Sequence, residues 1–130
     1  MKHLIYSLLI IIVVLLTACG LSKVFTKQQI LYIRFGGVGG YMNQNVSYVI
    51  DSKGQLLSNG QVLLTIPKDT LQSYYKQVKE LGEPFSHSGP NTCYLEIETN
   101  QGIRHYSWVL NDSIDADLKD LYHKLLSNIP

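Results

Sequence analysis

The stretch Cys93–Leu110, CYLEIETNQGIRHYSWVL, carries the clearest fold signal in the chain. Every second residue from Cys93 to Ile97 is apolar, with polar or aromatic residues between, and a period of two is typical of a half-buried strand. Asn100-Gln101-Gly102 is a turn sequence, after which Ile103–Leu110 can run back. The stretch therefore predicts an antiparallel hairpin with one covered and one solvated face.

The aromatic residues of this hairpin allow two interpretations. We expect one face to combine them with charged residues: Tyr94, Glu96, Glu98, Arg104, Tyr106 and Trp108. The aromatic side chains would either pack beneath a helix or form an exposed recognition patch, since tyrosine and tryptophan combine contact area with a polar tip. The alternation alone leaves both interpretations open.

Upstream, short β-forming runs separated by turn signals predict a β-meander. Three runs cover residues 29–35, 46–51 and 55–58, and residues 61–65 are expected to extend or continue the sheet. Ser52-Lys53-Gly54 and Asn59-Gly60 supply tight turns, and Asn-Gly is typical of two-residue hairpins. Between the first two runs we expect a flexible loop around Gly36–Gly40.

Two amphipathic segments predict helices. The first follows Pro67, ends before Gly82 and Pro84, and carries an apolar stripe: Leu71, Tyr74, Tyr75, Val78 and Leu81. The second follows three candidate N-cap residues, Asn111, Asp112 and Ser113, and carries its own stripe: Ile114, Leu118, Leu121, Tyr122, Leu125 and Leu126. Both stripes should pack on the sheet.

The order of these elements is βββαββα, which predicts a small antiparallel sheet, a β-meander plus a hairpin, packed by two helices. This is an α+β architecture. Residues 29–130 are enough for one small domain with its own core, but not for two. We therefore expect a single domain in this range.

Residues 1–20 have a different character. Lys2 is followed by the apolar run Leu4–Leu16, which is shorter than the roughly 20 residues of a membrane-spanning helix. The run ends in Leu16-Thr17-Ala18-Cys19, and this pattern resembles the type II signal peptides of bacterial lipoprotein precursors. The resemblance implies removal of residues 1–18 and attachment of diacylglyceryl and palmitate chains to Cys19. An ordinary secretory signal and an uncleaved short anchor are the alternatives.

The same resemblance implies a location in the cell envelope. Gly20 stands where enterobacterial lipoproteins retained in the inner membrane carry aspartate, which favours the outer membrane, facing the periplasm. Residues 19–28 would form the lipidated cysteine and its tether, with a reach of roughly 30 Å at about 3.3 Å per residue. The domain would therefore work close to the membrane.

Charge and cysteine content exclude several classes of function. Lys2 is the only one of the 11 basic residues within residues 1–18, and none of the 10 acidic residues lies there, so the mature chain has no net formal charge. Nucleic-acid binding, which needs a basic face, is not expected. With Cys19 lipidated, Cys93 has no partner for an intramolecular disulfide, and we expect it to be a small buried apolar residue.

No residue pattern indicates catalysis, a cofactor or a metal. The glycines are not followed by Gly-Lys-Ser/Thr and lead into a strand, unlike a phosphate-binding loop. The histidines His87, His105 and His123 lack zinc-ligand spacing, and Ser86 lacks a G-x-S-x-G context. We therefore expect a non-enzyme without cofactor or metal, and keep a small hydrolase centred on His87 or His105 as an alternative.

A binding role is the remaining expectation. Exposed backbone amides and flanking aromatic residues favour a partner-binding segment: Phe35, Gly36, Gly37, Gly39, Gly40 and Tyr41. The element order also resembles emfourin-type inhibitors of thermolysin-like metalloproteases, with Gly36 and Gly37 as the matching positions and residues up to Gly60 as an insertion. That resemblance implies an inhibitor that uses Gly36–Gly40 as a wedge. We expect a lipid-anchored, non-catalytic protein-binding domain, with the inhibitor and the envelope hydrolase as alternatives.

Overall fold

The computed structural model describes residues 2–12, 28–39 and 45–130. Residues 2–12 form a helix in which every residue is exposed. Among the described residues, no helix has the length and apolar character needed to cross a membrane. Cys19, the rest of the predicted tether up to residue 27, Gly40 and Tyr41 lie outside the described residues.

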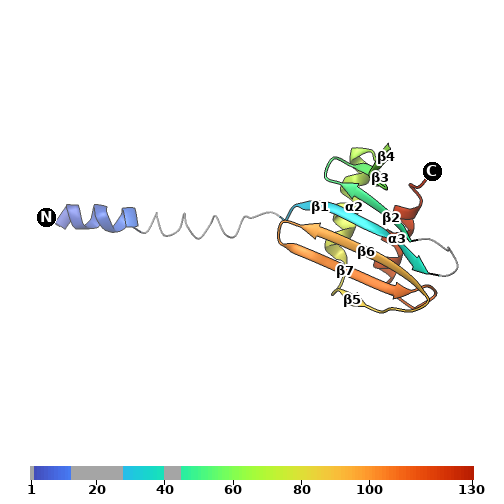
Figure 1. The fold of residues 1–130 in the computed structure, drawn as a ribbon. Coiled ribbons are helices and arrows are strands. Elements are labelled where there is room, and N and C mark those ends of the chain that lie inside the picture. The colour runs from blue at the N-terminus through green and yellow to red at the C-terminus, as the bar shows by residue number, and fades with distance from the viewer. Residues whose placement is uncertain (1, 13–27, 40–44) are drawn as a thin grey trace.

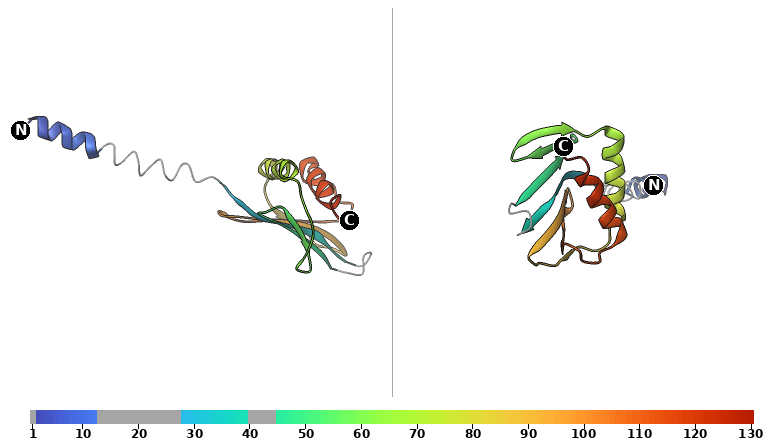
Figure 2. Two further views of the ribbon diagram at one scale, coloured as in Figure 1. Left: turned by 90° about the horizontal axis from the view of Figure 1, so that it is seen from above. Right: turned by 90° about the vertical axis from the view of Figure 1, so that its right-hand side faces the viewer.

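Seven strands form one sheet, and two helices cover one of its faces (Figures 1 and 2). The strands are β1 (Ile30–Gly39), β2 (Val46–Asp51), β3 (Gln55–Ser58), β4 (Gln61–Thr65), β5 (Phe85–Ser86), β6 (Asn91–Thr99) and β7 (Gly102–Val109). Their order in the sheet is β4-β3-β2-β1-β6-β7-β5. The helices α2 (Lys68–Glu80) and α3 (Ala116–Leu126) lie side by side on the covered face.

The α+β class with a sheet packed by helices is confirmed, but the predicted strand order is incomplete. Residues 61–65 form a separate strand, β4, so four strands precede α2 where the predicted order has three. The segment between α2 and β6 contains the unpredicted strand β5, which pairs with β7 in parallel, so the sheet is mixed and not purely antiparallel. A strand of two residues is too short to produce an alternating pattern. Only its neighbour β7 stabilises it as a strand.

The predicted tight turns are confirmed by their backbone conformations. Asn59 and Gly60 have φ values of 51° and 77°, as expected for a two-residue hairpin turn of the primed type. Gly54 has φ of 80°, and its N–H donates to the Asp51 carbonyl at 3.0 Å. Local turn chemistry therefore sets the connections from β2 to β4.

The hairpin of β6 and β7 forms as predicted, but the predicted grouping of its side chains is wrong. Leu95 faces Tyr106 across the ladder and Cys93 faces Trp108, so the aliphatic residues of β6 share the covered face with the aromatic residues of β7. Arg104 lies on this face opposite Ile97. Tyr94, Glu96 and Glu98 lie on the other face, because the register of the turn sets which residues of the two strands face the same side.

Both helices pack their apolar stripes on the sheet. Leu71, Tyr74 and Val78 of α2 are buried, and Arg104 Nη2 donates to the Val78 carbonyl at 3.1 Å near the end of that helix. The start predicted for α3 is wrong: its N-cap is Asp115, whose Oδ1 accepts from the Asp117 N–H at 2.8 Å. Asp112 instead accepts from the Val109 N–H at 3.1 Å.

The predicted loop around Gly36–Gly40 is also wrong in part, because β1 continues to Gly39. Gly36 and Gly37 pair with Ser47 and Val46 on β2, and with Tyr94 and Cys93 on β6. Strand pairing on both sides outweighs the low strand preference of glycine here. The glycines therefore belong to the centre of the sheet.

Candidate functional site

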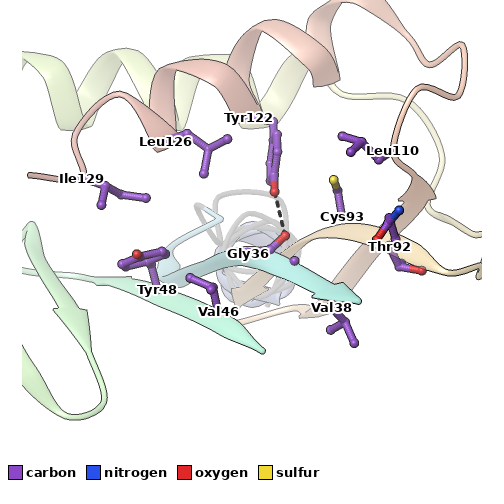
Figure 3. Close-up of a pocket in the computed structure, with 12 residues that line it drawn as sticks. Gly36, Val38, Val46, Tyr48, Thr92, Cys93, Leu110, Tyr122, Leu126 and Ile129 are labelled. Atoms are coloured by element: carbon purple, nitrogen blue, oxygen red, sulfur yellow. Dashed lines mark hydrogen bonds between the residues drawn. The ribbon is translucent and has the colours of Figure 1, made fainter. Parts of the chain in front are cut away.

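An apolar pocket lies between one end of the sheet and α3 (Figure 3). Its volume is about 220 Å³. The floor comes from β1, β2 and β6, and the roof comes from α3 and the residues after it. Most of the wall is apolar, with side chains that include Val46, Tyr48, Cys93, Leu110, Leu126 and Ile129.

The pocket exists because Gly37, the middle one of three residues that lie side by side across the sheet, has no side chain. Val46, Gly37 and Cys93 are neighbours across β2, β1 and β6. A Cβ atom built on Gly37 would have the Thr92 carbonyl oxygen, at 3.5 Å, as its nearest neighbour, which is ordinary van der Waals contact. The space above Gly37 is therefore free for another group.

Tyr122 forms the middle of the pocket wall and supplies its principal polar group. Its hydroxyl donates to the Gly36 carbonyl at 2.7 Å, and its ring packs edge-on against Trp108 with a centroid distance of 4.9 Å. Burial raises the pKa of Tyr122 well above its ordinary value of 10, and the neighbouring Cys93 thiol contributes. The Tyr122 hydroxyl is thus neutral and already hydrogen-bonded to the backbone. The interior of the pocket is therefore mainly apolar.

A second hollow of about 480 Å³ lies next to the pocket along α3. The two cavities share Cys93, Leu110, Tyr122 and Leu126. The second hollow adds the polar and charged side chains Asn111, Asp112, Lys119 and His123. Together the cavities form a groove with an apolar end and a polar end, which we call the α3 groove.

The structure separates the residues predicted to bind a partner. Phe35 has no exposed surface and stacks on Tyr48 with a centroid distance of 5.6 Å, so its prediction as a surface contact is wrong. Gly36 and Gly37 line the pocket, Gly39 is the last residue of β1, and Gly40 and Tyr41 lie outside the described residues. Gly36, Gly37 and Gly39 are within a strand and do not form a protruding wedge.

The other half of the pocket was not predicted. Tyr122 and Leu126 were expected only as members of the apolar stripe of the last helix, and Cys93 only as a buried apolar residue. A helix stripe gives no sign that one part of it covers a residue without a side chain. Only the packing of α3 over β1 brings these residues to Gly37.

The alternative hydrolase residues lie apart from the pocket. On the open face of the sheet, Glu96 interacts with His105 Nδ1 at 3.3 Å and accepts from Arg34 Nη1 at 3.2 Å. Ser86 Oγ lies 3.0 Å from Ser107 Oγ. The backbone N–H of His87 donates to the Ser107 carbonyl at 2.9 Å. Within the described ranges, however, neither the His87 nor the His105 imidazole hydrogen-bonds to a serine hydroxyl, and no group of His, Cys, Asp and Glu is placed to hold a metal ion.

Comparison with known proteins adds no relative. No family model matches the chain, and no curated protein or solved structure is detectably similar to it.

Proposed function

We propose that this protein is a lipid-anchored, non-catalytic binding protein of the bacterial cell envelope, and that its pocket holds an apolar group of a partner. The observation that carries the proposal is the apolar cavity of about 220 Å³ above Gly37. Concave, mostly apolar pockets are the usual form of binding sites. An engineered cavity of about 150 Å³ holds benzene, so this volume suits one aromatic ring or branched aliphatic side chain.

The groups in the pocket favour binding over catalysis. A general base must accept a proton near neutral pH, whereas the Tyr122 hydroxyl donates to the Gly36 carbonyl and its pKa is raised above 10. Cys93 is partly buried and lies among apolar side chains. The pocket thus offers shape and apolar contact to a ligand.

Lipid attachment is tested by substitution of the two cysteines. In cells fed radioactive palmitate, the full-length wild-type protein should become labelled, whereas Cys19→Ala should accumulate as unlabelled precursor, because only a thiol at position 19 can accept the diacylglyceryl group. Cys93→Ala is the matched control and should be labelled like the wild type. Label on Cys19→Ala, or none on the wild type, would contradict the proposed anchor.

The binding role is tested with a photo-crosslinking amino acid at Leu110, whose side chain borders the pocket (Figure 3). Leu110 is 49% exposed, and the control position Val62, on edge strand β4, is similarly exposed at 52%. In native membranes, the full-length protein should form a defined adduct from position 110 and none from position 62. The adduct should disappear when Gly37→Leu fills the pocket. Equal adducts from both positions would refute the pocket as the binding element.

A further inference from the structure

The pocket lies at the end of the domain opposite to the point where the predicted tether enters. Residue 28 precedes β1, which runs across the domain (Figure 1). The pocket is lined by Gly36, Gly37 and Val38 near the other end of this strand. Residues 28 and 36 are eight positions apart, or roughly 26 Å in an extended chain at about 3.3 Å per residue. The end of the domain that carries the pocket is therefore remote from the tether.

The position of the pocket relative to the tether indicates which molecules can reach it. If lipid on Cys19 holds the protein to a membrane, as proposed above, the point of attachment and the pocket lie at opposite ends of the domain. A partner that approaches from the aqueous side can reach the pocket directly.

The surroundings of the pocket also resemble a protein interface. Central apolar pockets that take one large side chain, bordered by polar residues, are typical of such interfaces. The polar end of the α3 groove contains Asp112, Lys119 and His123. This border is mixed in charge and does not form the cluster of cations that an anionic lipid headgroup favours.

Within this border, the acidic side chain is already engaged and the lysine is not. The carboxylate of Asp112 accepts from the backbone N–H of Val109. Lys119 forms no ion pair among the described residues, and it lines the groove. A partner with a carboxylate beside its apolar group would complement this lysine.

We infer that the α3 groove binds a polypeptide that inserts one large apolar side chain above Gly37 and places an Asp or Glu side chain of the same segment near Lys119. The inference rests on the proposed function and specifies its partner. The apolar side chain supplies most of the affinity, because it removes the pocket wall from water. The acidic residue supplies selectivity between segments.

A display library of random linear peptides, selected on the full-length lipidated protein in lipid nanodiscs and counter-selected on empty nanodiscs, tests the inference. Enriched peptides should carry Phe, Trp or Leu close to Asp or Glu. Gly37→Leu should weaken their binding at least about tenfold, since its side chain would occupy the pocket. Lys119→Glu should weaken it by roughly fivefold and shift selection towards Lys or Arg, whereas Lys53→Glu, in a turn away from the groove, should change neither.

A second measurement needs no substitution in the pocket. Cys93 borders both cavities, so a bound peptide should slow its alkylation by a maleimide in the wild-type protein. Circular dichroism should show that Gly37→Leu remains folded. Unprotected Cys93, or peptides that bind Gly37→Leu as tightly as the wild type, would overturn the inference.

Two further outcomes separate this inference from the proposed function. If vesicles of anionic phospholipid protect Cys93 and peptides do not, the occupant is lipid and the inference is wrong. If no peptide motif emerges while the adduct from position 110 persists, the binding role stands but a linear acidic segment is not the partner. Loss of that adduct as well would refute both.

Discussion

Gly36→Ala should lower the free energy of unfolding by at least about 3 kcal/mol, beyond the range of roughly 1–3 kcal/mol that overpacking usually costs. A Cβ atom at this position would lie well inside van der Waals contact with the Val46 carbonyl oxygen, and 2.9 Å from its carbon. These are backbone atoms of the paired strand β2, so relief requires β1 and β2 to separate. Urea denaturation followed by circular dichroism measures the effect.

Gly37→Ala is the matched control for this prediction. It changes the next residue of the same strand by the same single methyl group, but its Cβ meets nothing closer than the Thr92 carbonyl oxygen at 3.5 Å. The free energy of unfolding should change by less than about 1 kcal/mol. Equal losses for the two variants would show that general strand preference, and not the approach of Val46, makes glycine necessary at position 36.

Phe35→Ala should cost about 3–5 kcal/mol of stability, as removal of a buried phenylalanine ring usually does. Phe35 has no exposed surface and lies on the covered face of β1, opposite Tyr48 and Leu95. Since small domains are stable by only about 5–15 kcal/mol, the variant should unfold at markedly lower urea concentration. The midpoint of that transition is the quantity to compare.

Val38→Ala, three residues along the same strand, is the control for Phe35→Ala. Val38 is exposed, so the free energy of unfolding of the Val38→Ala variant should stay within about 0.5 kcal/mol of that of the wild type. If Phe35→Ala unfolds at the same urea concentration as the wild type, Phe35 is not part of the core. In that case its earlier interpretation as a partner contact would regain support.

These two pairs of variants also distinguish effects on stability from effects on partner binding. Phe35 affects the pocket only through the fold, and substitution of Gly36, which lines the pocket, also disturbs the pairing of β1 with β2. Gly37 lines the pocket without being needed for packing. Loss of partner binding in a Gly37 variant that keeps its stability therefore reports on the pocket itself, whereas the same loss in a Phe35 or Gly36 variant does not.

Local signals predicted much of the fold. The alternation in Cys93–Thr99, the Asn59-Gly60 turn and the stripe from Leu71 to Leu81 each depend on residues a few positions apart. The corresponding hairpin, tight turn and helix α2 are present in the structure. Such features are predictable because backbone geometry fixes the period of strands and helices and the φ values of turns.

Features that depend on distant neighbours were not predicted. β1 continues through Gly36–Gly39 because β2 and β6 pair with it on both sides, which overrides the usual effect of consecutive glycines. β5 is a strand only because it lies beside β7. The covered face of β7 depends on its register with β6, and alternation within β7 does not reveal that register.

The sequence by itself determined the strands of the hairpin, the tight turns and the two packing helices. Tertiary structure alone decided that Gly37 marks a pocket. A glycine in a strand leaves usable space only if its neighbours do not fill it, and here Tyr122, 86 residues after Gly36, hydrogen-bonds to that residue and holds α3 above the gap. No local pattern encodes that contact, because it depends on how the whole chain packs.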